Sequence, residues 1–245
     1  MTDTHHTPIR PQDLLEMMRR RRSSRTGFLE DREVSEGEIA QLLEAARAAP
    51  SGGNAQPWEF IVIRDAGMRL KIVELYKHQL REKIEIERLI RGTSSVSGVG
   101  WRNAPVLILV LGDPRTSLCF PLRTAEDKAE SHFFTGLGNA TLQMMLMAES
   151  MGLSTQYISD CASPWFSLML KHLLGIPLEL RVYHIVPVGY TEVDATPKSR
   201  RPLDSMVHYE RYDAAKLRSR DYLEKFAAED SIQAKDYDRG GTRRG

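Results

Sequence analysis

The strongest constraint on the fold is the aliphatic run Val106–Leu111, six consecutive apolar residues between Ala104-Pro105 and Asp113-Pro114. A run of this length without alternation predicts a strand that is buried on both faces. Such a strand needs apolar material on either side, and the hydrophobic residues, 41% of the chain, supply enough for a core of that kind. The sequence therefore predicts a globular protein with a sheet strand in its interior.

A second constraint is a helical segment over 131–151 that is apolar on nearly every side. One face carries an apolar residue at every third or fourth position: Phe133, Leu137, Ala140, Met144, Met147 and Met151. Leu142, Met145 and Leu146 occupy much of the other side. A helix of this kind has to be covered all round, so it is expected at a packed centre or at a contact between subunits.

The other expected helices and strands are bounded by helix-capping residues and by prolines and glycines that interrupt regular structure. Ser35 and Glu38 form a capping box, so a helix should begin at Glu36 and stop before Pro50. Residues 51–58 are a loop by composition. The other expected helices cover 13–21, 65–91 and 164–174, the other strands 60–63, 153–158 and 182–188, and an amphipathic piece covers 214–228.

The chain shows no repeat and no long linker, which predicts one domain with extensions. We expect a flexible N-terminus over 1–10, the domain over 11–207 and an extension over 208–245 that is helical and then disordered. No apolar run reaches the roughly 20 residues of a membrane helix, so no membrane association is expected. With 34 basic and 33 acidic residues the net charge is +1, which argues against a nucleic-acid partner. Two cysteines fit a cytoplasmic protein without a zinc site.

Two basic clusters, far apart in the chain, could bind an anion. The first comprises Arg21, Arg22, Ser23 and Arg25, and the second is the loop Lys198–Pro202. Guanidinium groups and ammonium groups suit phosphate oxygens, although composition alone indicates solvated surface charge. The pair Gly136 and Gly138 is no dinucleotide-binding motif, because it follows a helical pattern and lacks the third glycine.

Several segments together resemble the FMN-dependent nitroreductase family over about residues 12–207. In chain order they are Arg21-Arg22-Ser23-Ser24-Arg25, Ala48–Phe60 with Pro50-Ser51-Gly52-Gly53-Asn54, Gly152-Leu153, Leu174–Pro177 with Val186–Tyr190, and Pro197–Leu203. The resemblance implies an α+β fold, a mixed or antiparallel sheet flanked by helices, and an intertwined homodimer with FMN at the interface. A small-molecule electron acceptor would be the partner.

The resemblance also implies roles for particular residues. Arg21, Arg22, Ser23, Lys198 and Arg200 would serve the phosphate and ribityl chain. Arg25 and Asn54 would contact the polar edge of the flavin ring, and Ser51 and Gly52 would come from the neighbouring subunit. Tyr157, Ile158, Ser159 and Asp160 would lie over the flavin and offer backbone donors near N5 and O4. Gly52 and Gly53 would let the backbone approach a planar ligand.

The chain departs from its relatives at three places. Ser159-Asp160 stands where several relatives have Glu-Gly, and the loop Gly92–Gly100 and the insertion Cys119–Lys128 match no known subgroup. The lid residues expected of a halotyrosine deiodinase are not found.

The expected function is an oxidoreductase that passes hydride from NADH or NADPH through flavin N5 to a nitroaromatic, quinone or related acceptor. No side chain is assigned a catalytic role, and no metal is expected. Two alternatives stay open. One is an FMN-dependent dehydrogenase or other specialised flavin chemistry, and the other is a protein that binds flavin or nucleic acid without catalysis.

Overall fold

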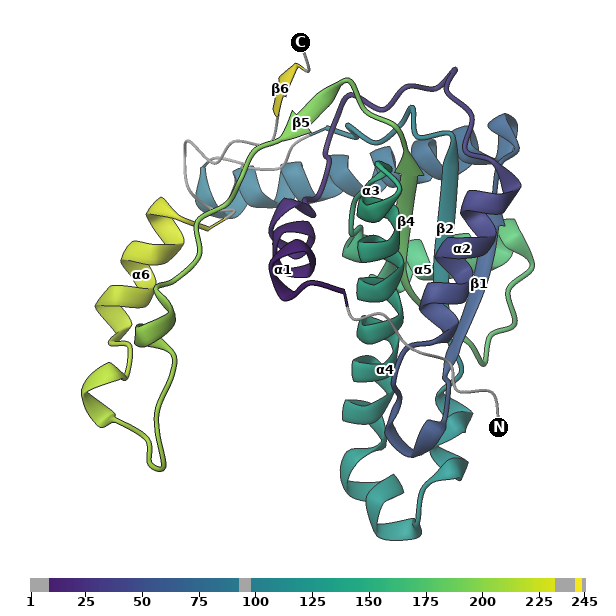
Figure 1. The fold of residues 1–245 in the computed structure, drawn as a ribbon. Helices are drawn as coiled ribbons and strands as arrows, with labels where there is room; N and C mark the ends of the chain where they lie inside the picture. The colour runs from purple at the N-terminus through teal and green to yellow at the C-terminus, as the bar shows by residue number, and fades with distance from the viewer. Residues whose placement is uncertain (1–8, 93–97, 232–240, 244–245) are drawn as a thin grey trace.

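The computed structural model describes residues 9–92, 98–231 and 241–243 (Figure 1). Its centre is a four-stranded antiparallel sheet in the order β1-β2-β4-β3. The strands are β1 (Trp58–Ile63), β2 (Val106–Gly112), β3 (Ser154–Thr155) and β4 (Arg181–Gly189). Helices cover the sheet on both faces, which confirms the expected α+β fold.

Strand β2 lies in the middle of the sheet and is buried at every residue, as its apolar run predicts. Its side chains alternate between two separate hydrophobic clusters. Leu107, Leu109 and Leu111 join one cluster, and Val106, Ile108 and Val110 join the other. A continuous apolar run is needed here because alternate residues of a strand point to opposite faces.

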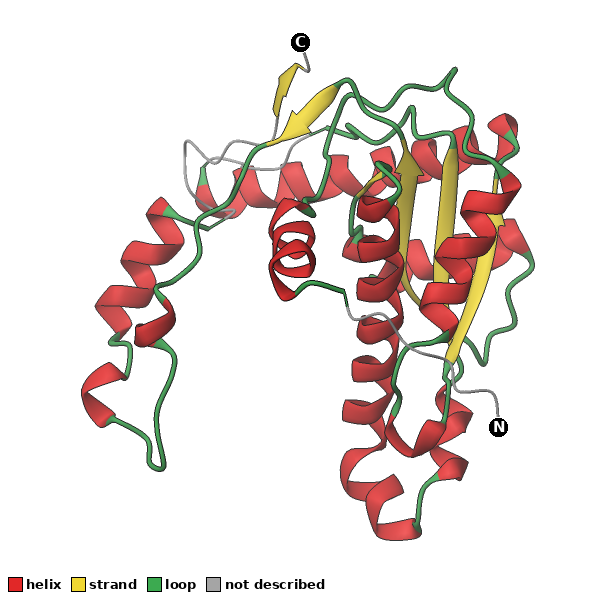
Figure 2. Cartoon of the chain, in the orientation of Figure 1, coloured by secondary structure: helices red, strands yellow, loops and turns green. Residues whose placement is uncertain are grey.

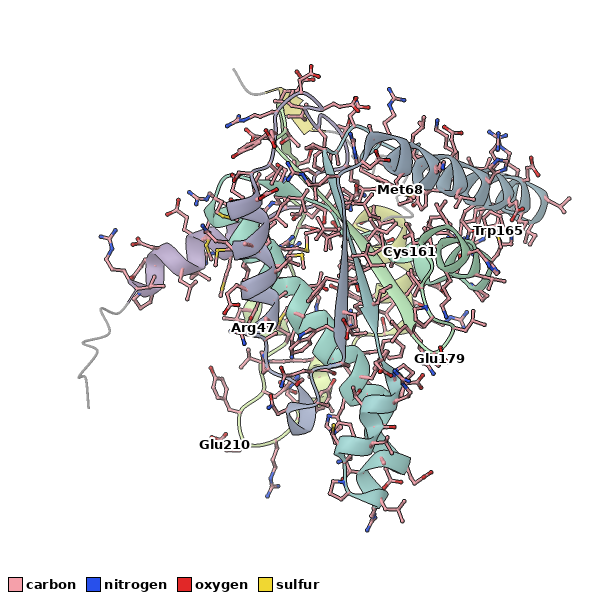
Figure 3. The ribbon with its side chains drawn as sticks, turned by 90° about the vertical axis from the view of Figure 1, so that its right-hand side faces the viewer. Arg47, Met68, Cys161, Trp165, Glu179 and Glu210 are labelled. Carbon is pink, nitrogen blue, oxygen red and sulfur yellow. The ribbon has the colours of Figure 1, made fainter. Side chains whose placement is uncertain are left out.

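The helices form two outer layers. α2 (Glu36–Arg47) and α4 (Leu122–Ser150) pack in one cluster, and α3 (Ala66–Arg91) and α5 (Pro164–Leu174) pack in the other. Figure 3 shows this arrangement edge-on, with Arg47 on one side of the strands and Met68 and Trp165 on the other. The capping box of Ser35 and Glu38 is present, and Asp65 caps α3 through the amide of Met68.

Helix α4 is longer than the sequence predicted. It begins at Leu122 rather than near Ser131, so most of the insertion expected over Cys119–Lys128 belongs to it, after the 3-10 turn Pro114–Cys119. Pro121 stands just before the first helical residue with φ −55° and ψ 146°, the extended conformation that is usual for an N-cap residue. Within one chain Phe134 is 40% exposed and Leu142 50% exposed, so the rest of that chain does not cover this apolar helix on every side.

The strand expected over 153–158 is shorter in the structure. Only Ser154–Thr155 form β3, because the chain leaves the sheet edge at Gln156 and turns into the 3-10 segment Ser159–Ala162. Ile158 keeps a single bridge to Ile185 of β4. The first helix, α1, covers Pro11–Arg20 instead of 13–21.

The C-terminal extension leaves the body of the molecule as an arm (Figure 2). The amphipathic piece expected over 214–228 is divided into the turn Ala214–Lys216 and α6 (Arg220–Glu229), because Ser219 caps a new helix through the amide of Tyr222. Two short strands, β5 (Val193–Ala195) and β6 (Gly241–Arg243), pair with each other. The expectations for 1–8, 232–240 and 244–245 lie outside the described residues.

Candidate functional site

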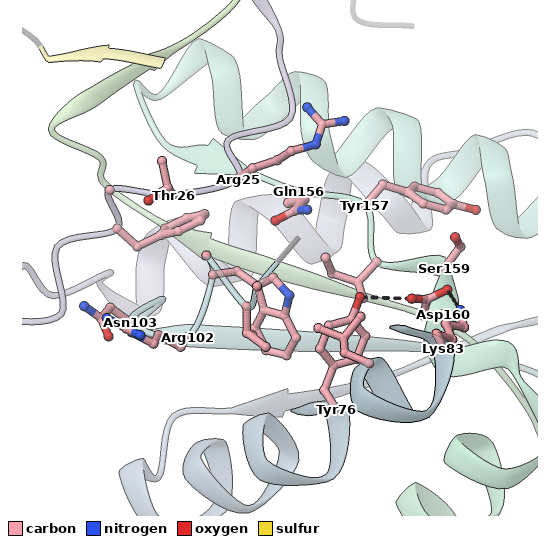
Figure 4. A pocket seen from close by; sticks show the side chains of 18 of the residues that line it. Arg25, Thr26, Tyr76, Lys83, Arg102, Asn103, Gln156, Tyr157, Ser159 and Asp160 are labelled. Carbon is pink, nitrogen blue, oxygen red and sulfur yellow. Dashed lines mark hydrogen bonds and ion pairs between the residues drawn. The ribbon is translucent and has the colours of Figure 1, made fainter. Parts of the chain in front are cut away.

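A cavity of about 1070 Å³ opens beside the sheet on the α3 side (Figure 4). Its wall comes from the segment Arg25–Phe28, the C-terminal half of α3, the segment Gly98–Asn103 and the turn Gln156–Asp160. These pieces are far apart in the sequence, so the cavity exists only in the folded chain. Five residues of the expected flavin site line it: Arg25, Tyr157, Ile158, Ser159 and Asp160.

Backbone contacts fix the segment that carries Arg25. The amide of Ser24 donates to the carbonyl of Thr155 in β3 at 2.9 Å, and the amide of Glu192 donates to the carbonyl of Gly27 at 3.0 Å. The segment Gly98–Asn103 lies against it so closely that a Cβ on Gly100 would stand 1.6 Å from the carbonyl oxygen of Arg25. Glycine is therefore required at position 100 for these two walls to meet.

The turn Tyr157–Asp160 offers fewer backbone donors than the sequence suggested. The amide of Ile158 donates to the carbonyl of Ile185 at 3.0 Å, and the Ile158 carbonyl accepts from the Ile185 amide at 3.1 Å. Ile158 is thus a sheet contact that lines the cavity, and its amide is already paired within the chain. The next amides, those of Ser159 and Asp160, begin a 3-10 helix, where N–H groups have no intrahelical acceptor.

The carboxylate of Asp160 is held by two side chains of α3. The Tyr76 hydroxyl donates to Oδ2 at 3.1 Å, and Lys83 Nζ lies 2.5 Å from Oδ1 (Figure 4). Burial, and then the charge and hydrogen bond of Asp160, raise the pKa of Tyr76 well above its ordinary value. The phenol therefore stays protonated and donates. Neither Tyr76 nor Lys83 was expected at the site.

The inner wall of the cavity is aromatic and contains a buried polar atom without a partner. Trp101 is almost fully buried and packs on Tyr76 with ring centroids 5.2 Å apart. Gln156 Oε1 is buried and has no hydrogen-bond partner within the part of the chain that the structure describes. A carbonyl oxygen in that position costs stability unless a ligand or water donates to it. Gln156 also escaped the sequence analysis.

Arg21 of the first basic cluster and Arg200 of the second lie near each other, and neither of them lines the cavity. Burial lowers the pKa of Arg21, and the neighbouring charges of Arg22 and Arg200 lower it further, against the opposing effect of Glu149. Arg200 belongs to the second cluster, where its guanidinium donates to the carbonyls of Lys198 and Ser199 at 3.2 and 3.0 Å. Arg21 and Arg200, which are far apart in the sequence, therefore repel each other, and a bound anion would offset that repulsion.

The loop of Ser51, Gly52 and Asn54 does not line the cavity and packs instead against the middle of α4, where it faces His132 and Gly136. Gly52 and Asn54 belong to one 3-10 turn, and Asn54 is not among the residues that line the cavity with Arg25. The expectation that Asn54 and Arg25 both contact the polar edge of a flavin stays a prediction.

The glycines of this loop are needed for packing inside the chain. A Cβ on Gly52 would lie 2.6 Å from His132 Nδ1, and a Cβ on Gly53 would lie 2.8 Å from the Phe120 ring. Within one chain, the space beside the two glycines is thus taken up by His132 of α4 and by Phe120, which follows the 3-10 turn Pro114–Cys119. Asn139 Nδ2 of α4 also donates to the Pro50 carbonyl at 3.0 Å and anchors the loop.

Across residues 9–92, 98–231 and 241–243 no group of three or more His, Cys, Asp or Glu side chains is placed to hold a metal ion. Among the same residues no helix combines the length and apolar character of a membrane span.

Comparisons with known proteins agree with this fold. The model of the Nitroreductase family matches residues 18–190. A protein of Archaeoglobus fulgidus named "Putative NADH dehydrogenase/NAD(P)H nitroreductase" is 30% identical over 179 residues, which are 73% of this chain and 86% of that protein. Iodotyrosine deiodinase 1 of Mus musculus is 29% identical over 216 residues, with 81% of this chain and 70% of that protein covered.

A solved structure is similar as well. The crystal structure named "putative nitroreductase in complex with fmn", from Desulfovibrio desulfuricans, has a TM-score of 0.61 and 26% identity, and the match covers 84% of this chain and 100% of that one. The family match covers well over half of the chain. This protein therefore belongs to the Nitroreductase family.

Proposed function

We propose that the protein is an FMN-dependent oxidoreductase that takes hydride from NADH or NADPH and delivers it to a nitroaromatic, quinone or related electron-poor acceptor. Family membership supports an oxidoreductase, and one relative in the family is solved with FMN. The observation that carries the proposal is the cavity itself, which gathers Arg25 and the turn Tyr157–Asp160 beside the basic clusters. FMN is a planar ring with an anionic tail, and that arrangement suits both parts.

Three features of the site fit FMN. Arg21 and Arg200 repel each other, which a phosphate would relieve. Gln156 Oε1 needs a donor, which the ring edge can provide. The cavity of about 1070 Å³ leaves room for a second planar molecule beside the flavin, as alternating binding of reductant and acceptor requires.

Each group of residues has a defined task in this proposal. When bound, FMN supplies the redox chemistry by accepting and releasing hydride at N5. Arg25 stabilises the negative charge that develops at the N1 and O2 edge on reduction. The amides of Ser159 and Asp160 orient the opposite edge. The aromatic wall of Trp101 and Tyr76 keeps water away from the inner side of the cavity.

We further propose that the active form is a homodimer with FMN at the interface. The arm after residue 202 exposes large apolar side chains, with Leu203 73%, Tyr209 79% and Leu217 70% exposed. Helix α4 exposes Phe134 and Leu142. Exposed apolar residues on an arm and on a central helix are typical of surfaces that a second copy covers.

Sedimentation equilibrium tests the dimer. We expect the full chain to sediment as two copies with bound FMN, because the site needs the loop of Ser51, Gly52 and Asn54 from a partner. A monomer that retains FMN would contradict the shared site.

Asn54 gives a second test of the shared site. Its backbone has φ +52°, so Asn54→Gly keeps the turn without strain and removes only the amide side chain. We expect flavin reduction by NAD(P)H to slow by about two- to tenfold, the value of one hydrogen bond, with the melting temperature within the range of the wild type. Stopped-flow reduction and thermal melting of the same variant check both quantities. An unchanged reduction rate would assign Asn54 to the turn alone.

A second candidate function on the same site is reductive dehalogenation of a halogenated phenol. The similarity to iodotyrosine deiodinase over 81% of this chain favours it. An acceptor panel tests both functions: FMN-loaded, pre-reduced protein is mixed with a nitroaromatic, a quinone or a halophenol, and flavin reoxidation is followed without oxygen. Fast reoxidation by the first two supports the proposed function, and halide release from the third supports the alternative.

The cellular setting is part of the proposal. Cys119 and Cys161 are free thiols, one exposed and one buried, which is in keeping with a reducing cytoplasmic compartment.

The near balance of basic and acidic residues gives no support to the alternative that the protein binds nucleic acid.

A further inference from the structure

The turn Ser159–Ala162 is tied to α3 by three side chains on one face of that helix. Tyr76 and Lys83 hold the two carboxylate oxygens of Asp160, and Gln79 Nε2 donates to Ser163 Oγ at 2.9 Å. Positions 76, 79 and 83 are spaced three and four residues apart, so they form one stripe along α3. The stripe faces the residues that would contact the flavin.

We propose that Lys83 and Tyr76 are positioning residues that hold and neutralise Asp160 beside the flavin, so that α3 sets the reduction potential of FMN in this cavity. The inference rests on the proposed function and extends it to two residues that touch neither flavin nor acceptor in the proposed mechanism. It concerns the position where several relatives have Glu-Gly instead of Ser159-Asp160.

The charge of Asp160 needs this neutralisation because of its place in the cavity wall. The carboxylate is 31% exposed and lines the same cavity as Arg25. Reduced flavin carries additional negative charge, so an uncompensated carboxylate nearby would disfavour reduction. Lys83 is the cation in contact with the Asp160 carboxylate. Arg91, which also lines the cavity, pairs instead with Glu87 at 3.5 Å.

The same contacts also fix the backbone. Asp160 stands near the start of its 3-10 segment, where its amide and that of Ser159 are without intrahelical acceptors. Because the Asp160 side chain is bound at both oxygens, its main chain has little freedom to rotate these amides away from the cavity. Tyr76 is buried against Trp101 and Phe166, so the anchor on the α3 side is rigid.

The test is the midpoint potential of bound FMN, measured by spectroelectrochemical titration of the FMN-loaded protein. We expect Lys83→Met to shift the potential to a more negative value and to slow flavin reduction by about tenfold. Lys83→Arg should keep the wild-type potential, since it preserves the cation. Lys83→Met combined with Asp160→Asn should return the potential toward the wild type, since both charges are then removed.

A matched control lies on the same helix. Lys77 pairs with Glu74 at 2.6 Å, is partly exposed and does not line the cavity, so Lys77→Met should leave the potential unchanged. Thermal melting of the FMN-free variants separates loss of fold from loss of charge.

Three results would overturn the inference. The first is an FMN-loaded Lys83→Met variant with the wild-type potential, which refutes the inference and leaves the proposed function standing. The second is a shifted potential that the double variant does not restore, because the effect would then be structural. The third is a wild-type protein that takes up no FMN, which overturns the proposed function together with the inference.

Discussion

Replacing Arg21 and Arg200 together with alanine is expected to weaken FMN binding by about 100-fold or more. Each guanidinium is expected to form charge-assisted bonds with the phosphate, and such bonds contribute about 1.5–3 kcal/mol each. Arg200→Ala alone should weaken binding by about tenfold or more. Isothermal titration of the FMN-free protein measures both dissociation constants.

Without FMN, loss of Arg200 should not reduce the stability of the protein. Arg200 lowers the pKa of Arg21 through like-charge repulsion, so removing Arg200 relieves an unfavourable interaction. The free energy of unfolding without FMN should therefore stay the same or rise slightly, even as affinity falls. Arg123→Ala is the control, because Arg123 forms an exposed pair with Asp127 on α4 and does not line the cavity. Unchanged FMN affinity in the double variant would refute the phosphate assignment.

Gly100→Ala is expected to lower the free energy of unfolding by about 1–3 kcal/mol, the usual cost of forcing extra volume into packed structure. A Cβ at that position would stand 1.6 Å from the Arg25 carbonyl oxygen, so the two cavity walls have to separate. Because the separation of the two walls also moves Arg25, the affinity for FMN should fall as well.

Gly98→Ala is the matched control for this substitution. It lies two residues away in the same segment, and a Cβ there would meet no atom of the described residues within 4 Å. Its unfolding free energy should therefore stay close to that of the wild type. Denaturant titration of both variants measures the difference. Equal stability of the two would show that the segments do not meet as described.

The parts of the fold that local sequence determines could be predicted. The apolar run of β2 needs cover on both faces, and the structure divides its side chains between two clusters. The capping box at Ser35 and the left-handed Gly175 after α5 mark helix ends through contacts within a few residues. The start of α4 was missed, because Leu122–Lys128 has no apolar periodicity and shows only a proline before it.

The candidate site could be predicted only where a resemblance pointed to it. Tyr76 and Asp160 are 84 positions apart, and no local pattern connects them. In the sequence Tyr76 stands among the apolar positions of α3, between Val73 and Leu80, and the one available signal is that Lys83 lies two turns further along the same face. The neighbours of Gly52 and Gly53 could not be predicted for a related reason, since His132 and Phe120 lie far along the chain from them.

Anaerobic titration of the purified protein with NADH or NADPH tests the central proposal most directly. The protein is first incubated with FMN and freed of excess flavin, and its absorption spectrum is recorded before and after each addition. We predict a yellow protein with one FMN per chain, whose flavin absorption bleaches with NADH or NADPH and returns on addition of a nitroaromatic or quinone. A protein that stays colourless after incubation with FMN would contradict the account.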